Sequence, residues 1–246
     1  MVASYVLRQM YRAAEKAARG LIRDFGELGN LHLSRKSDGT FAIKSEINVE
    51  NRIINELDNK EYQFISRNTS NSATELKDCW TLDPLDGVAN FIRGIPYFAI
   101  NIAAKIDCEF LDGLIYDPLR GESYEAEKNS GAFLNGRTRI RVSGNERLEK
   151  SIIAVTMASS DTESKLIESG ALIRKTGSIS LDVAYMASGK YDAVIVKDAY
   201  IWNIASGMVL IRESGGFFEL HQKANKKFDL VAASSKKLLN NILSKL

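Results

Sequence analysis

Apolar residues recur along the first part of the chain at the spacing of a helix face. Between residues 5 and 26 they fall at intervals of three and four, and the range 45–57 repeats the pattern. We predict two amphipathic helices, with apolar positions at Val6, Met10, Ala13, Ala14, Ala17, Leu21 and Phe25 in the first and at Ile47, Ile53, Ile54 and Leu57 in the second. Between them, Asp38-Gly39 predicts a turn joining two short extended segments.

The rest of the chain changes from strands to an alternation of strands and helices. Runs of β-branched and aromatic residues broken by Gly, Pro, Asp or Asn predict strands at 79–84, 97–107, 109–118 and 121–129. After about residue 146, predicted strands at 151–157, 171–176, 191–197 and 228–235 alternate with predicted helices at 160–170, 178–189, 202–216 and 236–246. This alternation is typical of a sheet covered by helices. We predict two subdomains that share one cleft, formed by 1–145 and 146–246.

Composition excludes several classes of protein. A formal net charge of +2 gives no general electrostatic case for nucleic-acid binding. Two cysteines are too few for a disulfide framework or a zinc site, and two histidines leave little basis for a Ser-His-Asp triad. No run approaches the ~18 apolar residues of a membrane span, and the amphipathic N-terminus contains acids, unlike a secretory signal. We expect a soluble cytoplasmic protein that does not contact membranes.

The candidate chemistry is concentrated in the stretch "LDPLDGVANF", residues 82–91. Asp83 and Asp86 lie three apart across a proline-stiffened turn, where they and the Leu85 carbonyl are suited to divalent cations. Gly87 permits close backbone approach, and the amides of Gly87 and Val88 would face a phosphate at a helix N-terminus. Taken alone the motif is only moderately specific, because Asp-Pro and Asp-Gly are also common in simple turns.

Four ordered blocks make the motif more specific. They are "LDPLDGVANFIRGIPYFAINIAA", "GAFLNGRTRIRVS", "GSISLDVAYMASGKYDA" and "WNIASGMVLIRESGG". Together they resemble the inositol monophosphatase family, with patterns D-P-L-D-G-T-x-N-F, G-I-P-x-F-A-I-S-I-A and W-D-I-A-A-G, and the SuhB-type bacterial branch most closely. The resemblance implies an α-β-α-β-α layered sandwich, usually a homodimer, that hydrolyses a small phosphomonoester such as inositol 1-phosphate with Mg²⁺ and a metal-bound water.

The resemblance carries some site residues over unchanged. Asp83, the Leu85 carbonyl and Asp86 match the family's central metal ligands. Glu46 stands where an aspartate normally orients the water. Gly87 falls in the phosphate-facing turn.

Other site positions depart from the family pattern. Arg67 and Asn68 replace two glutamates, the first of them a metal ligand, and Val88 replaces the threonine that partners the water-orienting aspartate. Asn203 replaces an aspartate that ligates metal and faces the substrate. Val196 replaces a glutamate that contacts inositol hydroxyls. The loop between Thr156 and Arg174 is also shorter than usual, so the substrate rim would be reshaped.

These changes act in the same direction. Two close divalent cations need several carboxylates, whereas Arg67 is permanently cationic and opposes metal entry. We therefore expect weak or absent Mg²⁺ binding, unless Glu75 or Asp78 supplies a substitute carboxylate. Arg67 is predicted either to pair with Asp83 or Asp86 in place of a cation or to point into solvent.

Three functions remain open. The first is a family member with a degenerate site and a non-catalytic role, for which the SuhB resemblance suggests RNA polymerase or ribosomal RNA machinery as partner. The second is an active or altered Mg²⁺-dependent phosphatase with one ion at Asp83 and Asp86 and with Glu46 orienting water. The third is a phosphate- or nucleotide-binding module that uses Arg67 as a fixed cation.

Overall fold

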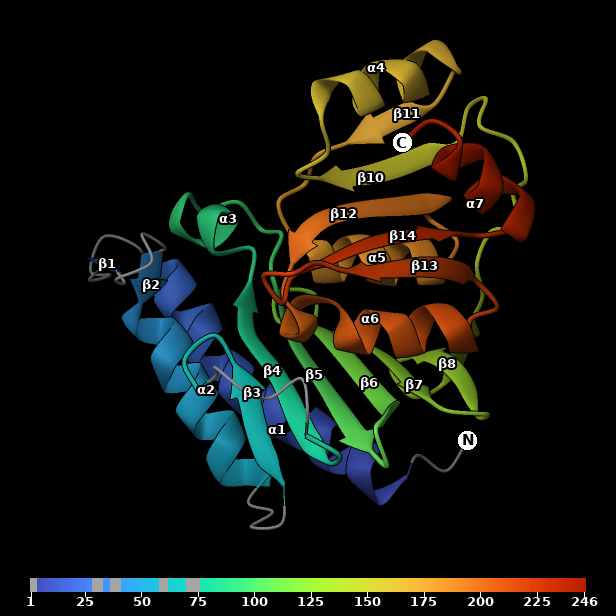
Figure 1. The fold of residues 1–246 in the computed structure, drawn as a ribbon. Coiled ribbons are helices and arrows are strands. Elements are labelled where there is room, and N and C mark those ends of the chain that lie inside the picture. Colours follow the sequence, from blue (N-terminus) through green and yellow to red (C-terminus); the bar gives the residue numbers. More distant parts are fainter. Residues whose placement is uncertain (1–3, 28–32, 36–40, 58–61, 70–75) are drawn as a thin grey trace.

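The structure is a computed structural model that describes residues 4–27, 33–35, 41–57, 62–69 and 76–246 (Figure 1). Two mixed sheets dominate it, together with a small hairpin of β1 (Leu33–Arg35) and β2 (Phe41–Ile43). The predicted Asp38-Gly39 turn lies outside the described residues, but the antiparallel strands that flank it agree with the prediction.

The larger sheet has seven strands in the order β3-β4-β5-β6-β7-β8-β9. Only β3 and β4 pair in parallel; the remaining neighbours are antiparallel, as expected for strands joined by short turns. The strands are β3 (Gln63–Ser66), β4 (Cys79–Asp86), β5 (Ala99–Ile106), β6 (Glu109–Asp117), β7 (Glu122–Glu127), β8 (Gly131–Leu134) and β9 (Thr138–Ile140).

The smaller sheet has five strands in the order β11-β10-β12-β14-β13. Its strands are β10 (Ile152–Thr156), β11 (Leu172–Arg174), β12 (Ala193–Ala199), β13 (Phe217–Gln222) and β14 (Phe228–Ala233). Sheet membership changes between β9 and β10, whereas a subdomain boundary at residue 145 stays a prediction. Strand β13 was not predicted: it is an edge strand whose side chains are almost all exposed, so it lacks the apolar alternation of a half-buried strand.

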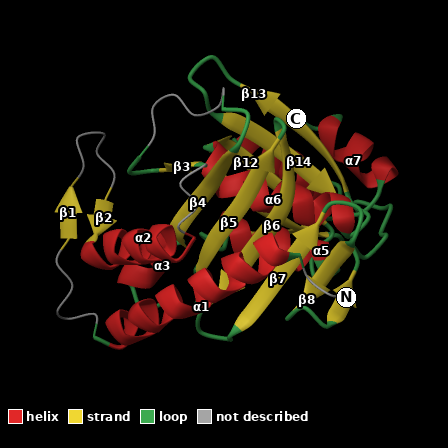
Figure 2. Ribbon diagram, turned by 90° about the horizontal axis from the view of Figure 1, so that it is seen from below, coloured by secondary structure: helices red, strands yellow, loops and turns green. Residues whose placement is uncertain are grey.

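Helices form three layers around the two sheets (Figures 1 and 2). Helices α1 (Tyr5–Gly26) and α2 (Lys44–Leu57) cover the outer face of the larger sheet, and a short α3 (Val88–Ile92) follows β4. Helices α5 (Ile179–Ala187) and α6 (Ile201–Glu213) lie between the sheets. Helices α4 (Ser160–Glu168) and α7 (Lys236–Leu243) cover the outer face of the smaller sheet. The α-β-α-β-α sandwich is thereby confirmed.

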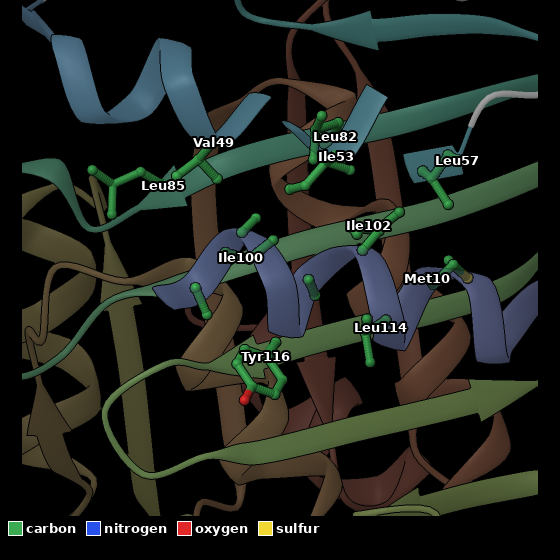
Figure 3. Packing of buried hydrophobic residues seen from close by; sticks show 14 of the residues in the cluster. Met10, Val49, Ile53, Leu57, Leu82, Leu85, Ile100, Ile102, Leu114 and Tyr116 are labelled. Carbon is green, nitrogen blue, oxygen red and sulfur yellow. The ribbon is translucent and has the colours of Figure 1, made fainter. Parts of the chain in front are cut away.

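The apolar stripe of α1 packs as its spacing predicts. Its buried side chains include Met10, Ala13, Ala14, Ala17 and Leu21, and Ser4 caps the helix by accepting from the Leu7 amide at 3.1 Å. Figure 3 shows α1 and α2 side chains meeting those of β4, β5 and β6. The prediction was wrong at Ile47, which is 41% exposed, because Ser45, Glu46 and Glu50 share the buried face of α2 with Val49 and Ile53. Of these polar residues, Glu46 belongs to the candidate site, where it forms an ion pair with Arg67. None of the described helices is both long and apolar enough to cross a membrane.

Candidate functional site

A β-bulge in β4 brings Asp83 and Asp86 to the same side of the sheet. Asp83 pairs with Asn101 of β5 and Asp86 with Ala99, so β4 has one more residue than its partner over this interval. In a regular strand, residues three apart point to opposite faces; the extra residue cancels that alternation. Both carboxylates consequently reach the helix layer between the sheets, whereas the Leu85 side chain is buried in the opposite core, under α1 and α2. Of Leu85, only the backbone carbonyl is suited to a ligand role.

Asp83 meets Asn203, a residue in the first turn of α6. Asn203 Nδ2 donates to Asp83 Oδ2 at 2.7 Å, while its Oδ1 accepts from the backbone amide of Tyr200 at 3.0 Å. The Tyr200 amide can only donate, so it fixes the orientation of the side-chain amide: the oxygen must face Tyr200 and the nitrogen must face Asp83. Both ends of Asn203 are therefore engaged, one in capping its own helix and one on Asp83.

Asp86 is held at the start of α5. Its Oδ2 accepts from the Ser178 hydroxyl and from the Ser180 backbone amide, each at 2.7 Å. Asn101 ties the two carboxylate sites together, because its Nδ2 donates both to Ser180 Oγ and to the Asn203 carbonyl at 3.0 Å. Asn101 occupies the serine position of the pattern G-I-P-x-F-A-I-S-I-A, so this departure could have been noticed in the sequence, whereas its contacts could not.

Arg67 and Glu46 form an ion pair at the edge of the site. Arg67, in the turn after β3, lies with Nη1 3.7 Å from Glu46 Oε2; the Arg67 side chain is 25% exposed and the Glu46 side chain is fully buried. The expectation that Arg67 hydrogen-bonds to Asp83 or Asp86 is wrong, since its ion pair is with Glu46. The alternative that Arg67 extends into solvent is also wrong, because its side chain is only 25% exposed. Its charge still reaches Asp83, whose pKa it lowers.

Glu50 is a buried acid that the sequence analysis missed. It lies one turn after Glu46 on α2, is 3% exposed, and accepts short hydrogen bonds from the Ser66 hydroxyl and the Asn68 side-chain amide. Asn68, which the sequence analysis matched to a family glutamate, thus donates a hydrogen bond to Glu50. The signal that could have found it is the spacing of four residues from Glu46, which places both acids on one helix face.

The remaining predicted residues have mainly structural surroundings. Gly87 has φ +90°, and a Cβ there would lie 2.9 Å from the Tyr97 carbonyl oxygen, so only glycine fits the turn into α3. Val88 packs at the edge of the core under α1 and α2. Val196 is fully buried in the apolar cluster between β12 and α6, where it offers no polar group to a substrate.

The pKa values of both Asp83 and Asp86 are raised above the ordinary value of a carboxyl group. Burial, followed by repulsion from Asp86, raises the pKa of Asp83, and Glu46 adds to the effect; Arg67 and the Asn203 amide oppose it. Burial also raises the pKa of Asp86, against the hydrogen bonds from Ser178 and Ser180. Asp182 of α5 is a third buried acid, and it lies near Asp86. Burial raises the pKa of Asp182 to about 7, although the Thr176 and Tyr97 hydroxyls donate hydrogen bonds to it.

This donor set does not fit a centre of two divalent ions. Within the described ranges, no group of three or more His, Cys, Asp or Glu side chains is placed to hold a metal. The Asn203 amide N–H faces Asp83 and the Arg67 guanidinium faces Glu46, and neither group has a lone pair to offer a cation. Asp78 does not supply a substitute carboxylate, because it lies at the opposite end of β4 from Asp83 and Asp86. There its Oδ1 accepts a hydrogen bond from the Asp107 amide at 2.7 Å. Glu75 lies outside the described residues.

Comparison with known proteins identifies the family. The sequence profile of the Inositol monophosphatase family matches residues 3–246. The chain belongs to this family. Its members are generally Mg²⁺ dependent.

Relatives within the family have two kinds of name. The chain is 38% identical to "Inositol-1-monophosphatase" of Mesorhizobium japonicum, over 88% of this chain and 86% of that protein. It is 32% identical to "Nus factor SuhB" of Xylella fastidiosa, over 85% of this chain and 79% of that protein. The crystal structure of extragenic suppressor protein suhB from Bartonella henselae superposes with a TM-score of 0.89 at 32% identity, covering 98% of each chain.

Proposed function

We propose that this inositol monophosphatase family member has lost all or nearly all Mg²⁺-dependent phosphatase activity and is retained for a non-catalytic role. The observation that carries the proposal is the hydrogen bond from Asn203 Nδ2 to Asp83 Oδ2, at 2.7 Å. With an aspartate at position 203, one oxygen would still accept from the Tyr200 amide and the other would face Asp83. Two facing carboxylates need a cation between them or a shared proton. The asparagine supplies an N–H bond instead and removes that need.

The charge around Asp83 supports the same proposal. Arg67 brings a permanent positive charge to a glutamate position, and its ion pair with Glu46 engages the residue that would orient a water. Replacing even the partners of metal ligands commonly costs ~10- to 100-fold in affinity or activity, so replacing ligands themselves should cost at least that much.

The proposed role is in transcription, with RNA polymerase or ribosomal RNA machinery as partner, and with the chain acting as a homodimer. Relatives named "Nus factor SuhB" support this choice over other non-catalytic roles. The proposed role can be tested by measuring how purified RNA polymerase binds to the immobilised protein and to its Asp86→Asn variant. We expect both proteins to bind equally, because the role does not need the acidic site.

Titrating Mg²⁺ against inositol 1-phosphate and an aryl phosphate tests the loss of activity, with a family member that has all ligands as control. We expect turnover several orders of magnitude below the control. Turnover in the common enzyme range of roughly 1 to 1000 per second, abolished in the same preparation by Asp86→Asn, contradicts the proposal.

The alternative is an active phosphatase with a single ion at Asp83 and Asp86. One observation favours it: the bulge in β4 still turns both carboxylates to the same side. Relatives named "Inositol-1-monophosphatase" also favour it. The Mg²⁺ titration separates the alternatives, because this one expects turnover that saturates with Mg²⁺ and disappears in Asp86→Asn.

A further inference from the structure

The outer face of the larger sheet is only partly covered by helices. The apolar cluster under α1 and α2 takes its buried sheet residues from β4, β5 and β6, with Phe64 of β3 packed against it, and none of its members from β7, β8 or β9. A helix ~10 Å wide covers about two strands spaced ~4.8 Å apart, so two helices cannot cover seven strands. Figure 2 shows β7 and β8 continuing beyond α1. A pocket of about 690 Å³ lies here between the flank of α1 and the ends of β7 and β8. Its volume is within the ~300–1,000 Å³ typical of small-molecule sites.

Three arginines line this pocket. Arg8 and Arg12 are one turn apart on α1, and Arg137 lies in the turn between β8 and β9. All three are exposed, and none forms an ion pair with any acid in the described part of the chain. Arginines elsewhere that do form ion pairs are Arg23, Arg67, Arg120 and Arg212. Exposed guanidinium groups that line one pocket, and that lack ion-pair partners in the described part of the chain, suit a phosphate, which can accept two parallel hydrogen bonds from a guanidinium.

The wall of the pocket adds a buried acceptor. Glu125 of β7 lines the pocket although it is only 6% exposed, and its Oε1 accepts from the Ser123 hydroxyl at 2.5 Å. Tyr124, its neighbour in the strand, faces the opposite core, so Glu125 is directed to the α1 side by strand alternation. A buried carboxylate with one neutral donor has spare acceptor capacity and suits a ligand hydroxyl.

We propose that this pocket binds a small organic phosphate that carries hydroxyl groups, with the phosphate on Arg8, Arg12 and Arg137 and a hydroxyl on Glu125. None of these residues belongs to the cluster around Asp83 and Asp86, so the site is separate from the candidate metal site. Two carboxylates also line the pocket, Glu125 of β7 and Glu15 of α1. They disfavour a bare polyanion, because either side chain would repel a phosphate that is not held by the arginines.

Isothermal titration calorimetry with ribose 5-phosphate, inorganic phosphate and ribose tests the proposal. Ribose 5-phosphate should bind more tightly than inorganic phosphate, and ribose should not bind detectably. Arg12→Ala/Arg137→Ala should weaken ribose 5-phosphate binding by about tenfold or more, as expected for loss of charge-assisted hydrogen bonds. The matched control Arg141→Ala/Arg147→Ala removes two exposed arginines outside the pocket and should leave binding unchanged. Asp86→Asn should also leave it unchanged, which distinguishes this pocket from the candidate metal site.

Glu125→Gln tests the hydroxyl contact separately. It should leave inorganic phosphate binding intact and reduce the preference for ribose 5-phosphate by about threefold or more. Circular dichroism checks that the variants fold; if the double variant does not, Arg137→Ala alone, on an exposed turn, replaces it. Three results would each overturn the proposal: no binding of ribose 5-phosphate to the unmodified protein, equal weakening by the control pair, or arginine-dependent binding of a single-stranded RNA with which ribose 5-phosphate does not compete.

Discussion

Asn203 and Asp83 meet between α6 and β4, with the amide nitrogen 2.7 Å from a carboxylate oxygen. Changing Asn203 to Asp keeps the acceptor for the Tyr200 amide but sets a half-buried carboxylate against the buried Asp83 carboxylate. We expect a loss of about 3 kcal/mol in the free energy of unfolding at pH 8, and a smaller loss at pH 5, where one carboxyl can be protonated. Urea unfolding at both pH values measures it. Asn240→Asp, on the exposed side of α7, is the control. A neutral result at pH 8 would mean that position 203 tolerates a carboxylate.

Restoring activity should need several substitutions together, because ligands and water-orienting groups act as a unit. Asn203→Asp alone should give no measurable hydrolysis while Arg67 remains. The combination Arg67→Glu, Val88→Thr and Asn203→Asp should give detectable Mg²⁺-dependent release of phosphate from an aryl phosphate. Full activity from Asn203→Asp alone would show that Arg67 does not oppose metal binding.

Removing metal should hardly affect stability. The cores under α1 and between the sheets do not include the acidic cluster, and a ligand stabilises only in proportion to its occupancy. Excess chelator should shift the melting temperature by less than about 1 °C. A fall of many degrees, reversed by Mg²⁺, would reveal a tightly bound structural ion.

Loss of Arg67 should be costly, because its partner Glu46 is fully buried. Arg67→Ala should lower the free energy of unfolding by about 2–4 kcal/mol, since it removes the guanidinium that forms an ion pair with this buried carboxylate. Added Mg²⁺ should recover part of the loss if a cation can replace the guanidinium. Arg52→Ala, an exposed arginine of α2, is the matched control. Equal effects of the two substitutions would show that the ion pair contributes nothing.

Stability should fall as pH rises from about 4 to about 8. The pKa of Asp182 is raised from 3.8 to about 7 by burial, so the folded protein binds the proton more tightly than the unfolded chain does. Folding is therefore favoured at low pH, and this advantage is lost as pH rises through the pKa of the folded state. Asp182→Asn should flatten the decline between pH 5 and pH 8, measured by urea unfolding, whereas the exposed Glu168→Gln should not. A slope that is the same in Asp182→Asn would place the proton elsewhere.

Gly87→Ala should separate steric crowding from backbone strain. Gly87 has φ +90° and a carbonyl oxygen 2.9 Å from the position of a Cβ, while Gly215 has φ +87° and nothing within 4 Å. Both substitutions force an alanine into a backbone conformation with positive φ, but only Gly87→Ala also brings a Cβ into contact with a carbonyl oxygen. It should destabilise by about 1–3 kcal/mol more than Gly215→Ala. Equal losses would show that the Tyr97 carbonyl moves aside easily.

Periodicity predicted the two long N-terminal helices and most of the longer strands, and missed the short strands β8 and β9 and the exposed strand β13. The stripe of α1 was readable because every buried position is apolar. Strand β13 carries exposed side chains on both faces, and Ile47 points outward because acids occupy the buried face of α2. The candidate residues were located by the motif, but their contacts depend on the bulge in β4, which pattern does not encode. The choice of Glu46 rather than Asp83 as the partner of Arg67 is likewise a matter of tertiary packing.

The hydrogen bonds around Asp83 and Asp86 have a mechanical consequence. They join residues of β4, α3 and β5 to residues of α5, α6 and the segment after β11, as in the bonds from Asn90 to the Thr176 carbonyl and from Asn101 to the Asn203 carbonyl. A centre held by ions can loosen whenever the ions leave, whereas amides and hydroxyls cannot dissociate from the chain. The contact between the two sheets that these hydrogen bonds make therefore does not depend on a bound ion, so both sheets should melt in a single transition at any Mg²⁺ concentration.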